Sequence, residues 1–195
     1  MRYQSLAWIC FLALLGGETS GQSTLPDETP LLRLHEMNVS PEASPATESG
    51  LCTVVAGNGD LYIEKRYHLI KDLKGDLKVF EGKLTDSQLN ELRSLLANET
   101  LKEISDNGAN HMPKSATDFG WVTAEIQRGS SIQEIDYRHW TVKSDEYSQA
   151  SQPYITLQKQ RQIVLSPLVN WAHTIDVSNL TPTEFRLGMC VRKKK

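Results

Sequence analysis

Two apolar, β-favouring runs flank Asn58-Gly59 in the stretch 51–70, and this arrangement constrains the fold more than any other feature of the chain. Asn-Gly is the strongest short-range signal for a two-residue hairpin turn, because both residues accept a positive φ angle. Apolar residues recur at alternate positions of the second run and so share one strand face: Leu61, Ile63, Tyr67 and Leu69. The stretch therefore predicts an antiparallel hairpin.

A further strand is expected at 77–84, and a well-marked helix follows it. Thr85 and Gln88 have the spacing of a capping box, and Leu84 stands where a hydrophobic staple begins. The helix carries apolar residues at helical spacing: Leu89, Leu92, Leu95 and Leu96. A lone amphipathic helix beside amphipathic strands normally buries its leucines against the sheet. We expect core packing for this helix face, and the alternative is a docking surface for a partner.

The second half of the chain holds weaker signals. Residues 121–140 predict a second hairpin around Gly129. Ile132 and Ile135 break the alternation of its return strand, which indicates a bulge or a misjudged strand start. Residues 149–162 are ambiguous between a loop, a strand and a weak helix.

Two final elements complete the expected fold. Ser166-Pro167 predicts a helix start, because proline is favoured at the first helical position. The segment 184–191 alternates in the manner of a strand. The resulting order, β-β-β-α-β-β-α-β, predicts an α+β domain over 51–191: a two-layer antiparallel sheet with two helices packed on one face.

The N-terminal segment has the pattern of an export signal. Arg2 supplies a positive charge, residues 6–15 form an apolar run, and small and polar residues follow. The run is too short to span a bilayer, which takes about 20 residues. We expect a signal peptide at 1–21, no transmembrane segment after its cleavage, and a secreted or periplasmic, envelope-associated location. Residues 22–50, rich in Pro, Ser, Thr and Glu, are expected to form a disordered linker.

Cleavage of the signal leaves Cys52 and Cys190, near the two ends of the domain. An exported protein meets a compartment that permits disulfides, so we predict a bridge between them. Two buried free thiols are the alternative. If the strand at 184–191 lies beside 51–55, the two cysteines meet across neighbouring strands.

Charge argues against one class of partner. The formal net charge is −3, but residues 192–195 are all basic, so the rest of the chain is more acidic than the total. A generally basic surface is absent, and no nucleic-acid partner is expected. The tail at 192–195 is expected to be a solvated end, with weak contact to an anionic lipid or polymer as the alternative.

Little in the sequence indicates catalysis. The five histidines are dispersed, and none has another at the i,i+3 or i,i+4 spacing of a metal site. No Gly-x-Ser-x-Gly motif is present. We expect no catalytic residue, cofactor or metal ligand. The aromatic and basic residues Trp121, Arg138, His139 and Trp140 are the candidate contacts to a sugar or an anion, although a strand end capped by tryptophan explains the cluster as well.

The run CTVVAGNGDLYIEKRYHLI, followed by LKVFEGKLTDSQLNELRSLL, resembles a pattern in uncharacterised exported bacterial α+β proteins. In that pattern a strand ending in Tyr/Phe-Glu-Gly leads to a Leu-Thr/Ser-x-x-Gln/Glu-Leu helix start and a leucine-rich helix. The resemblance covers residues 51–100, with a weaker similarity in SPLVNWAHTI at 166–175. It implies an envelope-associated domain without known catalytic residues.

Together these features favour an exported non-enzymatic domain that binds or scaffolds a protein, a glycan or an envelope component outside the cytoplasm. One alternative is a small secreted hydrolase, which would need Asp136, His139 and a second acid in one cleft. Another is a secreted inhibitor or partner-binding protein, which would need the leucines of the helix at 85–96 to be exposed.

Overall fold

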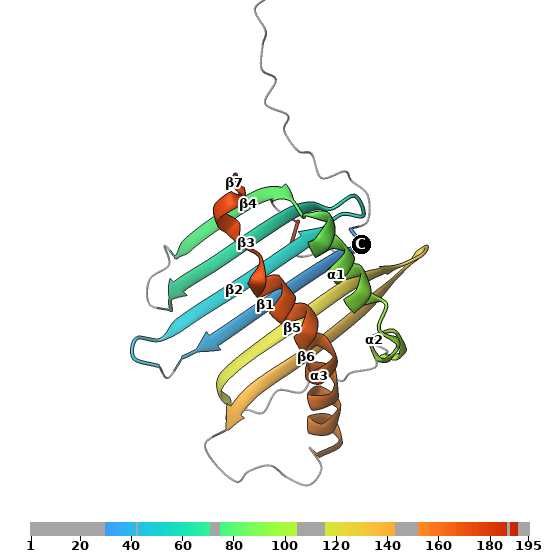
Figure 1. Ribbon diagram of the computed structural model, residues 1–195. Coiled ribbons are helices and arrows are strands. Elements are labelled where there is room, and N and C mark those ends of the chain that lie inside the picture. Colours follow the sequence, from blue (N-terminus) through green and yellow to red (C-terminus); the bar gives the residue numbers. More distant parts are fainter. Residues whose placement is uncertain are drawn as a thin grey trace, which may run out of the picture.

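The computed structural model describes residues 30–41, 43–70, 75–104, 116–142, 152–186 and 188–190. Its strands form one seven-stranded antiparallel sheet in the order β6-β5-β1-β2-β3-β4-β7, shown in Figure 1. The strands are β1 (Leu32–Ser40), β2 (Thr47–Val55), β3 (Asp60–Leu69), β4 (Asp76–Lys83), β5 (Ala116–Arg128), β6 (Ser131–Val142) and β7 (Thr181–Pro182). The helices are α1 (Asp86–Leu96), α2 (Glu99–Glu103) and α3 (Gln152–Thr174), with a short 3-10 turn η2 (Val177–Asn179). The α+β class is confirmed, and strands dominate the regular structure.

The linker predicted at 22–50 is wrong in its second half, because Leu32–Ser40 forms β1. This strand lies in the interior of the sheet, paired with β2 on one side and β5 on the other. Leu32 and Leu34 are 0% and 2% exposed, so this short apolar stretch buries far more surface than its composition suggests. The domain therefore begins about twenty residues before position 51.

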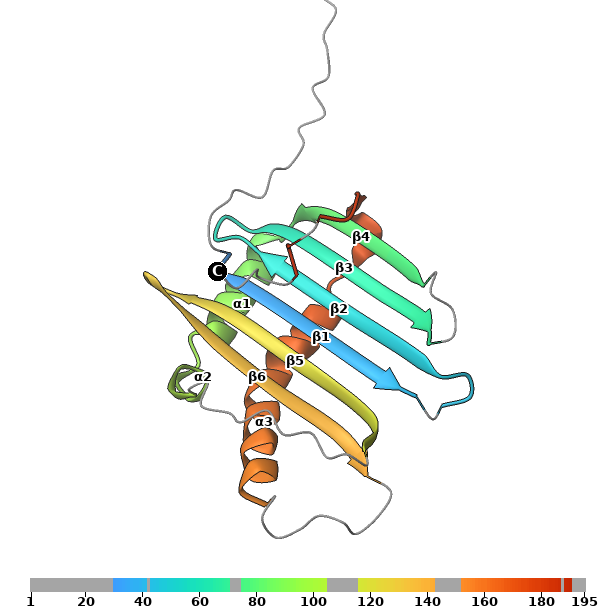
Figure 2. The same ribbon diagram turned by 180° about the vertical axis from the view of Figure 1, so that it is seen from behind.

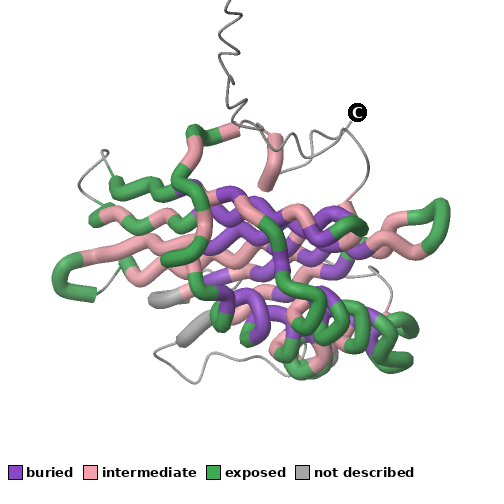
Figure 3. Tube along the Cα trace, turned by 45° about the horizontal axis from the view of Figure 1, so that its top comes forward, coloured by how far each residue is buried: buried purple, intermediate pink, exposed green. Residues whose placement is uncertain are grey.

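Helices α1 and α3 lie across one side of the sheet, with α3 running obliquely from β6 toward β4 (Figure 1). Thr85 and Gln88 form the predicted capping box. Leu89, Leu92 and Leu96 are buried in the main core cluster together with the inward residues of the strands, so the prediction of core packing is confirmed. Buried and exposed segments alternate along both helices in Figure 3, as expected for helices that bury one side.

The last helix begins before Ser166-Pro167, where a start was predicted. Helix α3 starts at Gln152 and passes through Pro167, which removes one backbone N–H without ending the helix. Both turns around the proline are held by fully buried side chains, Leu165 and Leu168. The ambiguous stretch 149–162 is therefore helical from Gln152 onward, because burial outweighs its weak helical pattern.

The prediction of a strand at 184–191 is also wrong. The last strand of the described residues is β7, which pairs with Phe80 and Glu81 of β4. The disulfide itself is confirmed: Cys52 and Cys190 are joined, with an S–S distance of 2.07 Å. Cys52 lies on β2, between β1 and β3, so the chain end crosses a face of the sheet instead of pairing with an edge. We call residues 184–186 and 188–190 the C-terminal strap.

The β5–β6 hairpin turns at Gly129, which has a φ of +63°. The register is continuous from Arg128↔Ser131 to Asp118↔Thr141, so the bulge considered at Ile132 and Ile135 is absent from this range. Ile135 faces the helices and is buried, whereas Ile132 belongs to the opposite face. The broken alternation reflects a strand with apolar residues on both faces.

The outer edge of β6 is partly closed by side chains of α3. The backbone N–H of Arg138 donates to Gln158 Oε1 at 2.7 Å, and Arg161 Nη1 donates to the carbonyl of Asp136 at 2.8 Å. These bonds occupy backbone groups that another chain could otherwise pair with. Within the described residues, no helix is long and apolar enough to span a membrane.

Candidate functional site

The sheet face opposite the helices carries the candidate site (Figure 2). Leu32 and Leu34 of β1 face the helices, so Arg33, His35 and Met37 face the other way, because side chains alternate along a strand. None of the described helices lies on this side in Figure 2. We call it the open face.

The C-terminal strap seals the β2–β4 half of the open face. A second apolar cluster, made of Cys52, Val54, Tyr62 and Val79, is covered there by Met189 and Cys190. Polar contacts hold the strap at two further points. Arg186 donates to the Glu81 carboxylate at 3.2 Å, and Arg33 Nε donates to the Met189 carbonyl at 2.6 Å.

The β1–β5 half of the open face keeps partly exposed apolar side chains. Met37 pairs with Trp121, and Val39 pairs with Phe119, so these four side chains form a contiguous group on two neighbouring strands. The rings of Phe119 and Trp121 are nearly parallel, with an interplanar angle of 12° and centroids 6.3 Å apart. All four residues are half-buried. We call Met37, Val39, Phe119 and Trp121 the aromatic patch.

Two arginines flank the aromatic patch along one row of the sheet. The register places Arg138 opposite Trp121 on β6, and Gly50 and then Arg66 on the other side of Met37. Arg66 is 41% exposed and pairs with Glu64 at 3.0 Å. No ion pair of the Arg138 side chain occurs among the described residues. The row therefore reads cation, aromatic ring, thioether, glycine, cation.

Gly50 leaves room for Met37 on this row. A Cβ at Gly50 would lie 3.4 Å from the Met37 sulfur and 3.3 Å from the Glu36 carbonyl oxygen. The methionine side chain therefore spreads over the glycine. Methionine is unbranched and adapts to irregular surfaces, which suits a binding patch.

The structure separates the four ligand-contact candidates. Trp121 and Arg138 are brought together on the open face, directly opposite each other. His139 lies on the helix side, because it is one residue from Arg138 on the same strand. The backbone of Trp140 pairs with Phe119, but its side chain lies outside the described residues.

Sequence reasoning missed three members of the aromatic patch: Met37, Val39 and Phe119. Phe119 stands two residues before Trp121, and that spacing was the available signal for a shared face. Met37 lies in the stretch taken as a linker, so no pattern within 51–191 could place it beside Trp121.

A second polar cluster surrounds Glu36 on the helix side. His173 of α3 contacts the Glu36 carboxylate, with 2.6 Å between Nε2 and Oε2. Burial lowers the pKa of His139, and the charge of Glu36 opposes that shift. Burial and, secondarily, Glu36 raise the pKa of Tyr137 to about 12, so the phenol stays protonated.

This cluster does not reproduce the cleft that a hydrolase would need. A Cβ at Gly120 would lie 2.4 Å from His139 Nε2, so the histidine ring is packed directly over the glycine backbone. Asp136 belongs to the opposite side of β6, and its carboxylate lies 3.4 Å from Arg161. Asp136 and His139 therefore do not converge. Among the described residues, no group of three or more acidic, histidine or cysteine side chains is arranged to hold a metal ion.

Two partly buried histidines predict an acid-sensitive fold. Burial lowers the pKa values of both His35 and His139 below the ordinary value of 6.5. The unfolded chain then binds more protons than the folded chain as the pH falls below 6.5, so the free energy of unfolding should decrease. Urea unfolding at pH 7.5 and pH 5 measures this loss. His139→Gln should reduce the loss between the two pH values, and an unchanged loss would show that His139 does not contribute.

No protein-family model matches this chain, and a search of curated proteins finds no match. The resemblance to exported bacterial α+β proteins therefore remains an expectation. The chemistry of the aromatic patch and its two arginines is the basis for a functional proposal.

Proposed function

We propose that this protein is an exported, non-enzymatic binding domain, a two-layer α+β module whose open face holds an acidic glycan outside the cytoplasm. The observation that carries the proposal is a row of five residues on five neighbouring strands, from β6 to β3: Arg138, Trp121, Met37, Gly50 and Arg66. It combines aromatic and apolar surface with a cation at each end.

Sugar rings and carboxylates match this row in complementary ways. A pyranose ring presents a flat C–H face that packs on an aromatic ring, and tryptophan offers the largest such surface. Arginine binds carboxylates through two parallel, charge-assisted hydrogen bonds. A glycan with sugar acids supplies both groups. Nucleic acid, with about one charge per 1.7 Å of duplex, would require many more cations than this face offers.

The basic tail at 192–195 lies outside the described residues. Its weak contact to an anionic lipid or polymer, the alternative considered from the sequence, therefore does not contribute to this proposal.

Export is part of the proposal. The expected signal peptide at 1–21 motivates it, and the Cys52–Cys190 disulfide supports it, because disulfides persist mainly in oxidising compartments. Three leucines of α1 are buried and Leu95 is partly buried, so an inhibitor that presents this helix has less support than binding through the open face.

The test uses the protein that an exporting host releases. Its N-terminal residue is sequenced first, and its binding to immobilised polysaccharides is then measured. An N-terminus near residue 21 is expected, and a retained Met1 would contradict export.

We expect retention on immobilised polygalacturonate and alginate but not on neutral dextran. Trp121→Ala should weaken binding about 30-fold, as loss of a central aromatic contact typically costs 2 kcal/mol or more. Arg138→Gln should weaken binding about tenfold, through loss of charge-assisted hydrogen bonds.

Two matched variants control for nonspecific effects. Tyr67→Ala removes an aromatic ring that is 51% exposed on the helix side of β3, and Arg93→Gln removes an exposed arginine of α1. Both should bind the acidic polymers as the unmodified protein does. Equal weakening by Tyr67→Ala and Trp121→Ala, or retention on dextran, would contradict the proposal.

A partner protein is the second candidate occupant of the patch. Tryptophan, methionine and arginine are enriched at protein interfaces, and the patch contains all three types. Failure to bind any acidic polymer, together with capture of one specific protein that Trp121→Ala abolishes, would favour this candidate.

A further inference from the structure

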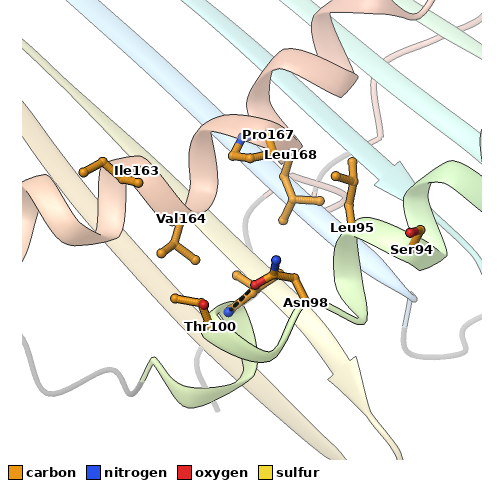
Figure 4. A pocket seen from close by; sticks show the side chains of 9 residues that line it. Ser94, Leu95, Asn98, Thr100, Ile163, Val164, Pro167 and Leu168 are labelled. Atoms are coloured by element: carbon orange, nitrogen blue, oxygen red, sulfur yellow. Dashed lines mark hydrogen bonds between the residues drawn. The ribbon is translucent and has the colours of Figure 1, made fainter.

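A cavity of about 380 Å³ lies between α1, α2 and α3, on the helix side of the sheet (Figure 4). Its lining comes from the neighbouring helices α1 and α2, the residues between them, and the distant helix α3. The apolar part is formed by Leu95, Leu101, Ile163, Val164, Pro167 and Leu168, and the polar part by Ser94, Asn98 and Thr100. Ile163 is 72% exposed, the highest value among the large hydrophobic residues that are described.

The chemistry of the lining favours uncharged ligands. The nine lining residues include no acidic or basic side chain. A carboxylate or ammonium group placed there would lose water without gaining an opposite charge, which costs several kcal/mol. The cavity therefore suits an uncharged ligand with mostly aliphatic surface.

Asn98 offers one polar contact at the cavity. Its Oδ1 caps α2 by accepting from the backbone N–H of Leu101 at 3.1 Å, the dashed line in Figure 4. This cap fixes the rotamer of the Asn98 side chain. The Nδ2 group lies on the side away from that bond (Figure 4) and is left as a donor. No partner of Nδ2 occurs among the described residues.

Pro167 offers the complementary contact on α3. In a regular helix the N–H of residue 167 would donate to the carbonyl of Ile163, four residues earlier, but proline has no N–H. Ile163 and Pro167 both line the cavity, one helical turn apart. The carbonyl oxygen of Ile163 therefore lacks its usual helical donor on α3, while Asn98, the N-cap residue of α2, lines the same cavity.

We propose that this cavity binds a small, uncharged aliphatic molecule with one hydroxyl or amide group. Such a group can accept from Asn98 Nδ2 and donate to the Ile163 carbonyl, while the aliphatic part packs on Leu95, Val164 and Leu168. The volume lies within the range of about 300–1,000 Å³ that is typical of small-molecule sites. A docked partner would need a much larger surface, about 800 Å² on each side. This site is separate from the aromatic patch and does not depend on the proposed function.

The test uses the full purified chain with hexanol and hexanamide as probes and hexanoate as the charged comparison, at pH 7.5. Amide chemical shifts are followed by NMR during titration. We expect saturable shifts confined to α1, α2 and α3, with a dissociation constant on the order of 1 mM for a ligand of this size. Hexanoate should bind at least about tenfold more weakly, because the lining offers no cation.

Three variants separate the proposed contacts from general destabilisation. Asn98→Asp keeps a side-chain oxygen for the α2 cap but removes the Nδ2 donor, and should weaken hexanamide binding about tenfold. Ile163→Trp fills the mouth from an exposed position and should abolish binding of both probes. Leu69→Trp, at a position 36% exposed outside the lining, should leave binding unchanged.

Three results would overturn the proposal. One is equal binding of hexanoate and hexanamide. Another is unchanged binding in both Asn98→Asp and Ile163→Trp while their spectra remain those of a folded chain. The third is a protein-concentration-dependent change in molecular mass that Ile163→Trp abolishes, because it would identify a second copy of the chain as the occupant.

Discussion

Replacing Cys52 and Cys190 with serine is expected to lower the free energy of unfolding by about 4–5 kcal/mol. The two residues are 138 positions apart, so the bond closes a loop that includes most of the described chain. Cross-linking so long a loop strongly restricts the unfolded ensemble in the loop-entropy treatment. The loss would be a large fraction of the 5–15 kcal/mol that typically stabilises a domain.

Loss of the disulfide should release the C-terminal strap more readily than it unfolds the rest of the domain. Without the bond, the strap remains attached through Arg186–Glu81, Arg33–Met189 and the two-residue strand β7. These partly exposed contacts are weak compared with the lost constraint. Release of the strap would expose Val54, Tyr62 and Val79, so increased binding of a hydrophobic dye is expected in the double variant.

Urea unfolding with and without reductant measures the effect. Reductant should destabilise the unmodified protein and leave the Cys52→Ser/Cys190→Ser variant unchanged, which controls for other actions of the reductant. A loss below about 1 kcal/mol in both comparisons would show that the noncovalent contacts of the strap are sufficient.

A chain that starts at residue 51 is expected not to fold, although the sequence alone places the start of the domain there. This truncation removes β1 and the first half of β2. Strand β5 then loses its partner β1, and the β5–β6 hairpin is disconnected from the rest of the sheet. The core also loses Leu32 and Leu34, which are almost completely buried.

Circular dichroism and thermal melting distinguish the two boundaries. A chain of residues 30–195 should melt cooperatively, whereas residues 51–195 should show no cooperative transition. The point variant Leu34→Ala gives a graded version of the test and should cost about 2–5 kcal/mol, the usual range for a buried leucine. Met37→Ala on the open face is the matched control and should cost less, because Met37 is only half-buried. A cooperative transition in the 51–195 chain would contradict the structural role of β1.

Local sequence signals predicted several elements correctly. Asn58-Gly59 marks the turn between β2 and β3, but only Gly59 has a positive φ, +89°, and residues 56–59 connect the strands instead of the two predicted. Thr85 and Gln88 mark the start of α1, and the spacing of its leucines predicts which side is buried. The energies behind these signals act within a few residues, so they can be read from a short stretch of sequence.

The candidate site was only partly predictable. The pairing of Trp121 with Arg138 depends on one hairpin, and both residues were singled out from the sequence. Met37 and Arg66 reach the same row through strands that are distant in sequence. The cavity joins α1 and α2 to α3 across more than sixty residues of chain, and none of its segments indicates a site by itself.

By itself, the sequence determined the turns, the capped helix, the class of fold and the pair of cysteines available for a disulfide. Only the tertiary structure placed β1 inside the sheet, carried α3 through Pro167 and brought the C-terminal strap across the open face. The physical reason is that these outcomes depend on backbone pairing and burial between residues far apart in the chain. The composition of residues 22–50 predicts little buried surface. Leu32 and Leu34 nevertheless belong to the core, because β1 pairs with two neighbouring strands and these leucines face the helices.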